Sequence, residues 1–126
     1  MKVSNSKRFS SKILAAFEAI KYLPIRAGDH RFINIWLVVV KNRVVVRSWN
    51  DKPSGWYRDF LSHPLGHVRI DDREHPVRAV PVRTVSLNDA TDDAFASKYT
   101  TKANAKYVKG FRAPRRKAAT LELVPA

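Results

Sequence analysis

The sequence contains no cysteine. This absence excludes disulfide frameworks, thiolate zinc sites and cysteine nucleophiles, and it is compatible with a reducing compartment. Long apolar runs are also missing, because the longest uncharged stretch, residues 32–40, is far shorter than the roughly 20 residues of a membrane span. A basic start precedes an apolar run, but Glu18 interrupts that run and no small-residue cleavage site follows. We therefore expect a cytoplasmic protein with no membrane partner.

Acidic residues are few, with 11 Asp and Glu against 24 Lys and Arg, and the formal net charge is +13. Such a surface attracts anions, so an anionic partner is the first hypothesis. The excess is uneven, because residues 71–97 contain six acidic and three basic side chains, whereas residues 98–126 contain one and eight. The 126 residues, 44% of them hydrophobic, suit one domain with its own core.

Apolar residues at helical spacing predict three helices. The first holds Ile13, Leu14, Phe17 and Ile20 and ends before Pro24, with Ser10 and Ser11 as candidate caps. The second is short and begins after Ser54, and the third begins at Ser86 or Asn88. Three early aspartates suit the N-terminus of the third helix, and its inner face is expected to hold four side chains: Ala90, Ala94, Phe95 and Tyr99.

Valine-rich segments predict the strands. Residues 32–49 read as a hairpin around Asn42, which tolerates a positive φ. The unalternating valines on both sides of the turn suggest strands that are covered on both faces. A short first strand is expected at residues 23–26 and a final one at residues 118–124.

A second hairpin is expected from residues 67–71 and 76–85, with its turn at residues 72–74. Pro76 and Pro81 should confine its longer strand to a sheet edge or a bulge. Residues 1–8 are expected to be a flexible basic N-terminus, and residues 100–117, which lack periodicity, a basic loop. Six strands with one N-terminal and two further helices give the fold class α+β, and a small antiparallel sheet loses its exposed edges by curling into a barrel.

Several short motifs carry a family resemblance: Ile35-Trp36, Val38-Val39-Val40, Val46-Arg47-Ser48, Trp56-Tyr57, Lys98-Tyr99 and the closing segment 120–125. They resemble bacterial domain-of-unknown-function family 2255 over about residues 22–125. More distantly, the order of elements is similar to the deazaflavin-dependent nitroreductases and the split barrels related to pyridoxamine phosphate oxidase.

The more distant resemblance implies a six-stranded split barrel, often a homodimer, with FMN or a deazaflavin in a groove at the dimer interface. The deazaflavin enzymes have a Gly-Arg-x-Ser-Gly turn before the second strand. Residues 25–31 of this chain read Ile-Arg-Ala-Gly-Asp-His-Arg instead.

The end of the 32–49 hairpin and the start of the following helix form a candidate phosphate and ring site. Its predicted cofactor-binding residues supply a guanidinium, hydroxyls, helix N–H groups and stacking rings: Arg47, Ser48, Trp49, Asn50, Lys52, Ser54, Trp56 and Tyr57. The alternatives are that Ser54 only caps the helix and that the aromatic rings fill the core. Arg47 could likewise be structural and pair with Asp51 or Asp59.

The C-terminal third contains a candidate anion-binding tail: Lys106, Lys109, Arg112, Arg115 and Arg116. Tyr107 and Phe111 alternate with these cations, as in single-strand nucleic-acid binders, although the sequence after Phe111 departs from an RNA-recognition motif. The tail could also fold over a cofactor's phosphates. Alternatively, these cations keep the protein soluble.

Other chemistry has no support in the sequence. His63 and His67 are separated by Pro64 and Gly66, and no further ligand completes a metal site, so we expect no metal. No nucleophile elbow, phosphate-binding loop or dinucleotide motif is present. The leading hypothesis is a homodimeric split barrel that binds a phosphate-bearing aromatic molecule such as a flavin or deazaflavin, with oxidoreductase activity as one outcome. The alternatives are a basic nucleic-acid-binding barrel and a non-catalytic ligand-binding barrel.

Overall fold

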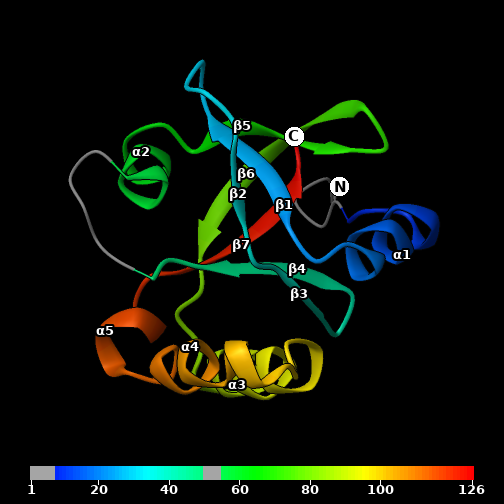
Figure 1. The fold of residues 1–126 in the computed structure, drawn as a ribbon. Coiled ribbons are helices and arrows are strands. Elements are labelled where there is room, and N and C mark those ends of the chain that lie inside the picture. Colours follow the sequence, from blue (N-terminus) through cyan, green and yellow to red (C-terminus); the bar gives the residue numbers. More distant parts are fainter. Residues whose placement is uncertain (1–7, 50–54) are drawn as a thin grey trace.

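A computed structural model describes residues 8–49 and 55–126. Its main feature is one antiparallel sheet, which curls into a half-barrel (Figure 1). The strands, in the order β2-β1-β5-β6-β7-β4-β3 across the sheet, are β1 (Leu23–Ala27), β2 (Ile33–Ile35), β3 (Val38–Val40), β4 (Arg43–Arg47), β5 (Leu65–Ile70), β6 (Arg73–Pro81) and β7 (Thr120–Pro125). The helices are α1 (Ser11–Ala19), α2 (Trp56–Ser62), α3 (Val85–Lys98), the 3-10 turn η2 (Lys102–Asn104), α4 (Ala105–Gly110) and α5 (Pro114–Lys117). The α+β class is therefore confirmed.

The described residues form seven strands, so the expectation of six was wrong. The difference lies at Trp36 and Leu37, where the predicted first arm of the hairpin divides into β2 and β3. β2 pairs with β1, whereas β3 pairs with β4. The backbone N–H of Leu37 donates to the hydroxyl of Tyr99 (3.1 Å), which satisfies a group that a continuous strand would have paired with its neighbour.

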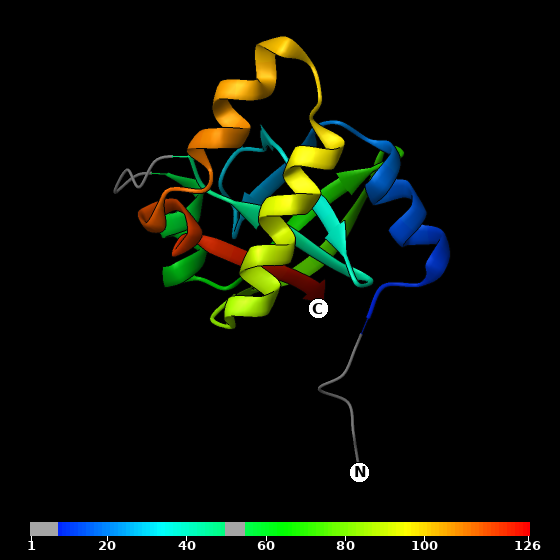
Figure 2. The same cartoon turned by 90° about the horizontal axis from the view of Figure 1, so that it is seen from below.

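The valines of β4 are covered on both faces, as their lack of alternation predicted. Val44 and Val46 belong to the main core, which also includes Phe17 of α1 and Phe60 of α2. Val45 belongs to a second cluster, in which it packs with Phe95 of α3. Figure 2 shows α3 lying across this outer face of the sheet. Because one chain covers both faces, the hairpin by itself gives no reason for a dimer.

Both hairpin turns have two consecutive residues with positive φ. Asn42 (φ 65°) lies in the first turn, as predicted, beside Lys41 (φ 52°). The second turn lies at Asp71 and Asp72, one residue before the predicted position. Two residues with positive φ match the twist of antiparallel strands, and Asn and Asp are the non-glycine residues that tolerate this best.

β6 is an interior strand that pairs with both β5 and β7 in unbroken register, so the expectation of an edge or a bulge was wrong. Its prolines lie at the limits of the pairing with β7, although Pro76 is also opposite His67 within the pairing with β5. Pro76 precedes Val77, where the register with β7 begins, and Pro81 is the last residue of the strand.

The helix starts agree with the sequence in one case out of three. The Ser10 hydroxyl accepts a hydrogen bond from the N–H of Ile13 and caps α1, as expected. The N-cap of α2 is Gly55, and that of α3 is Thr84 rather than Ser86 or Asn88. The three aspartates of α3 therefore lie beyond its first turn.

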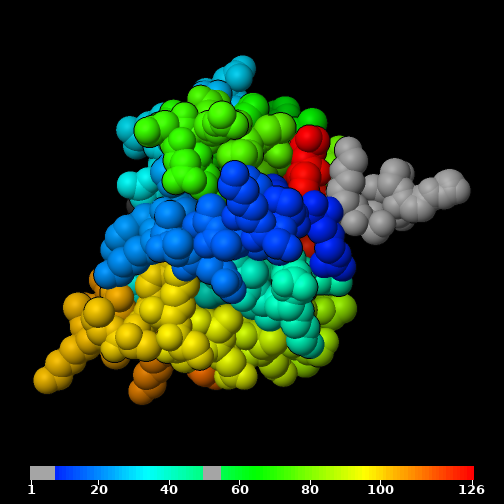
Figure 3. Space-filling model, turned by 90° about the vertical axis from the view of Figure 1, so that its right-hand side faces the viewer, coloured from blue at the N-terminus to red at the C-terminus, as the bar shows by residue number. Residues whose placement is uncertain are grey.

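Residues 100–117 are mostly helical, so the expectation of a loop was wrong. Their inward side chains, Asn104, Val108 and Phe111, follow one another at helical spacing, a pattern obscured by the many lysines between them. Figure 3 shows the right-hand side of the view in Figure 1, where α1 (blue) lies between the β5–β6 hairpin (green) and α3 (yellow). Within the described residues, no helix is both long and apolar enough to cross a membrane.

Candidate functional site

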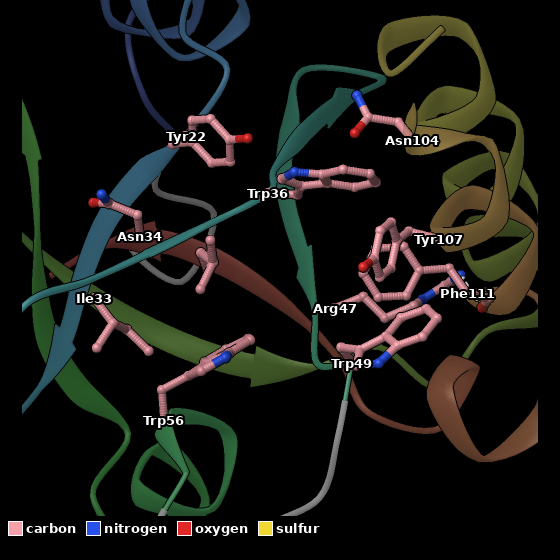
Figure 4. A pocket seen from close by; sticks show the side chains of 11 residues that line it. Tyr22, Ile33, Asn34, Trp36, Arg47, Trp49, Trp56, Asn104, Tyr107 and Phe111 are labelled. Atoms are coloured by element: carbon pink, nitrogen blue, oxygen red, sulfur yellow. Dashed lines mark hydrogen bonds between the residues drawn. The ribbon is translucent and has the colours of Figure 1, made fainter. Parts of the chain in front are cut away.

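An aromatic pocket of about 430 Å³ opens between the sheet and α4 (Figure 4). The chain has three tryptophans, and all three line this pocket. Its wall is formed by Tyr22, Ile33, Asn34, Ile35, Trp36, Arg47, Trp49, Trp56, Asn104, Tyr107 and Phe111. The volume lies within the range of small-molecule sites, which are mostly apolar and aromatic.

The break between β2 and β3 positions Trp36. Its indole stacks on the ring of Tyr99, with centroids 4.0 Å apart and planes 7° apart. The edge-to-face contact with Phe111 (5.9 Å) fixes the ring from a second side. Trp36 is therefore held by α3 and by the end of α4, and the break in the strand places it in the pocket wall.

Arg116 and Gly110 hold Trp49, which follows the end of β4. The guanidinium of Arg116 lies 3.7 Å from the centroid of the indole ring, and its Nε donates to the carbonyl oxygen of Trp49 (2.7 Å). A Cβ at Gly110 would come within 2.4 Å of Trp49 Cη2, so only glycine permits this packing. One face of the Trp49 ring is thus occupied by a cation of the chain itself.

Arg47 lies at the pocket wall, but its donors are used inside the fold. Nε donates to Thr120 Oγ1 (2.7 Å), and Nη1 donates to Asp92 Oδ1 (2.6 Å) and to the carbonyl oxygen of Phe111 (3.0 Å). Nη2 donates to the side-chain and backbone oxygens of Asn88 (3.1 and 3.3 Å). Burial lowers the pKa of the Arg47 guanidinium, and the hydrogen bond and charge of Asp92 oppose this effect.

These contacts favour the structural alternative for Arg47. The side chain has no exposed surface, and five bonds match the five N–H groups of a guanidinium. Its acidic partner is Asp92 of α3, a residue that the sequence did not suggest, because Asp51 and Asp59 are much closer to it in the chain.

The other predicted cofactor-binding residues divide into three groups. Trp49 and Trp56 lie in the same pocket, which is the arrangement that ring stacking requires. Ser48 is buried, and the Tyr57 hydroxyl lies 3.4 Å from the carbonyl oxygen of Ala118, outside the pocket lining. A third set lies outside the described residues: Asn50, Lys52 and Ser54.

The predicted anion-binding tail is also divided. Arg116 lies against Trp49, and Arg112 lies 3.7 Å from a carboxylate oxygen of Asp93. The remaining three, Lys106, Lys109 and Arg115, are exposed.

Eight pocket residues were not predicted as site residues: Tyr22, Ile33, Asn34, Ile35, Trp36, Asn104, Tyr107 and Phe111. Of these, the sequence singled out Tyr107 and Phe111 only as the aromatic residues between the cations of the tail. Trp36 had a signal, because a bulky aromatic residue stands there among mostly aliphatic strand residues. Asn104 had no such signal in the sequence, because its position in the pocket wall depends on the fold of residues 100–117.

The described lining of the pocket suits the binding of an aromatic molecule. Apart from indole N–H groups and tyrosine hydroxyls, its described polar lining consists of Asn34, Asn104 and Arg47. None of these described lining residues is a carboxylate, histidine or serine. A flat aromatic molecule would bury its faces against the tryptophans, and the two amides could satisfy polar groups at its edge.

A family model described as "Uncharacterized protein conserved in bacteria (DUF2255)" matches residues 13–123. The chain belongs to this family. The resemblance that the sequence motifs carried is thereby confirmed. No protein among those with curated descriptions matches the chain.

Among solved structures, this DUF2255 protein is similar to the conserved hypothetical protein Rv2991 from Mycobacterium tuberculosis. The TM-score is 0.58 at 11% sequence identity, and the alignment covers 100% of this chain and 85% of that one. At such low identity the similarity supports the barrel-like fold alone.

Proposed function

We propose that the tryptophan-lined pocket binds a flat, phosphate-bearing aromatic molecule of the flavin or deazaflavin kind. The observation that carries this proposal is the convergence of Trp36, Trp49 and Trp56 from three separate segments on one pocket. Tryptophan is costly to leave partly exposed, and an aromatic ligand would bury the surface that these rings present.

The aromatic lining of the pocket suits the ring of such a ligand. Its phosphate requires a cation other than Arg47, because the N–H groups of Arg47 already donate to groups of the protein. Two lysines lie beside pocket-lining tyrosines. Lys106 Nζ is 5.1 Å from the ring centroid of Tyr107, and Lys21 Nζ is 5.8 Å from that of Tyr22. The proposal therefore assigns the ring to the tryptophans and the phosphate to the lysines beside the pocket. A bound flavin or deazaflavin would supply hydride or electron transfer, while the chain would orient the ring.

Intrinsic fluorescence tests the proposal directly, because every tryptophan of the chain lies in the pocket wall. Titration with riboflavin and with FMN should quench the emission in a saturable way. Trp56→Phe should weaken both ligands, whereas Tyr57→Phe, a neighbouring change outside the pocket lining, should leave both affinities unchanged. Unsaturable quenching, or equal effects of the two substitutions, would contradict the proposal.

The phosphate contact has its own test. Lys106→Gln should weaken FMN about two- to fivefold, since an exposed ion pair is worth up to about 1 kcal/mol. Riboflavin, which lacks the phosphate, should bind the variant as it binds the parent. Lys12→Gln on α1 removes the same charge at a residue outside the pocket lining and serves as the control.

A further inference from the structure

Three lysines form an exposed basic stripe on η2 and α4: Lys102, Lys106 and Lys109. They are spaced four and three residues apart, as on one side of a helix. The inward residues of the same segment, Asn104, Val108 and Phe111, face the pocket and the second core cluster. The segment is therefore amphipathic, with its cations directed away from the body of the protein.

Acidic neighbours do not neutralise this basic stripe. The carboxylates of α3 form ion pairs with other cations. Lys117 Nζ lies 2.8 Å from a carboxylate oxygen of Asp89 and 3.0 Å from one of Asp92. Arg112 lies opposite Asp93. Within residues 8–49 and 55–126, no ion pair involves a lysine of the basic stripe. Nearby Arg115 adds a further exposed cation.

The basic stripe adjoins the aromatic pocket. Lys106 lies over the ring of Tyr107, which lines the pocket and is 39% exposed. Asn104, between Lys102 and Lys106 in the chain, also lines the pocket. Cations that track a phosphate backbone beside aromatic surfaces that receive bases are the combination by which single strands are bound.

We infer that the basic stripe binds single-stranded nucleic acid, with its phosphates on the three lysines and one unpaired base in the tryptophan-lined pocket. The placement of the base rests on the proposed function, whereas the placement of the phosphates does not. A duplex would gain only the ionic contacts, because its bases are stacked within the helix. An anionic membrane is a weaker fit, since Tyr107 is the one large exposed apolar side chain described on α4.

The experiment measures the affinity of the full chain for a fluorescent oligothymidylate over a range of salt concentrations. Each phosphate contact to a single strand contributes about −0.7 to the slope of log affinity against log salt. The triple variant Lys102→Gln, Lys106→Gln, Lys109→Gln should therefore reduce the magnitude of that slope by about 2 and weaken binding at low salt.

A matched control carries the same loss of charge on β6 and the segment after it: Arg73→Gln, Arg78→Gln, Arg83→Gln. These three side chains are also exposed, and no described ion pair involves them. This variant should keep the slope and most of the affinity. Equal losses in the two triple variants would show that only net charge matters and would overturn the inference.

Three further measurements distinguish the parts of the inference. Oligothymidylate should quench the tryptophan fluorescence, and binding without quenching would overturn the placement of the base while leaving the phosphate contacts. Vesicles of phosphatidylglycerol and phosphatidylcholine should bind the parent more weakly than the oligonucleotide does. Tighter binding to vesicles, lost in the Lys102, Lys106 and Lys109 variant, would overturn the nucleic-acid assignment. Riboflavin quenching should persist in that variant, so failure of this inference does not imply failure of the proposed function.

Discussion

Arg47 on β4 and Asp92 on α3 form a buried ion pair, with 2.6 Å between Nη1 and Oδ1. The side chain of Arg47 has no exposed surface and that of Asp92 is 6% exposed. The pair joins the sheet to the helix that covers its outer face. Through Phe111 and Thr120, Arg47 also reaches the end of α4 and the start of β7, so one guanidinium connects four elements near the pocket.

Arg47→Ala is expected to lower the free energy of unfolding by about 3–5 kcal/mol, because Asp92 would be left buried with one partner fewer. Arg47→Lys should recover only part of the loss, since an ammonium cannot reproduce the planar five-bond arrangement. Urea unfolding measures both changes. If instead Arg47→Lys left unfolding unchanged and weakened FMN binding, Arg47 would be a ligand contact, as the sequence first suggested.

Gly110→Ala is expected to disturb the pocket. In the last turn of a helix, alanine ordinarily stabilises by up to about 1 kcal/mol relative to glycine. Here the new Cβ would lie 2.4 Å from the Trp49 ring, and the ring must move. The variant should therefore show a shifted tryptophan emission and weaker riboflavin binding.

Lys109→Ala is the control for Gly110→Ala, because it changes the adjacent exposed residue of the same helix. It should leave the emission spectrum and riboflavin affinity unchanged. An unshifted emission in Gly110→Ala would contradict the tight packing of Trp49.

The local patterns of the sequence predicted much of the fold. The Ser10 cap and the Asn42 turn depend on residues within a few positions, so short-range rules apply. The β4 valines are buried by distant elements, but their lack of alternation is a local signal of that burial. The break at Trp36 and Leu37 depends on the hydroxyl of Tyr99, which is distant in the chain. Such a partner leaves no local pattern, and the strand count was wrong for that reason.

The pocket was predictable only in part. Trp49 and Trp56 stood out because they flank the end of a strand and the start of a helix. Asn104 and Tyr107 reach the pocket through the fold of η2 and α4, whose helical pattern the basic residues concealed. Arg47 was recognised as a buried cation that needs an anion, but the anion is a side chain of α3 rather than a ligand phosphate.

Asn42→Ala is expected to destabilise the β3–β4 hairpin by about 1 kcal/mol, because alanine tolerates the positive φ of this position less well than asparagine. Asn42→Gly should be neutral or slightly stabilising, since glycine adopts this conformation without steric cost. Thermal unfolding of the two variants measures the difference. A larger loss for glycine than for alanine would contradict the turn conformation.

Tyr99 should make the protein sensitive to alkali. Burial raises the pKa of its hydroxyl from 10.0 to about 12. The hydroxyl lies 2.7 Å from the carbonyl oxygen of Lys21, which it can reach only as a protonated donor. The folded protein therefore holds this proton more tightly than the unfolded chain, and the corresponding stability is complete below about pH 10 and lost as the pH rises towards 12.

Two pKa units correspond to about 2.7 kcal/mol, which is the upper limit of the loss expected from this group. Lys98 has the opposite effect on the free energy of unfolding. Burial lowers the pKa of its amine, so the folded state gains stability relative to the unfolded chain as the pH rises towards 10.5. Tyr99→Phe separates the two effects, since it removes the tyrosine hydroxyl and retains the Lys98 amine. Urea unfolding from neutral pH to about pH 11 should therefore show a steeper alkaline loss of stability in the parent than in Tyr99→Phe. Parallel curves would show that Tyr99 ionises equally readily in the folded and unfolded chains. That result would contradict a buried Tyr99 hydroxyl that pairs with the backbone of Leu37 between β2 and β3.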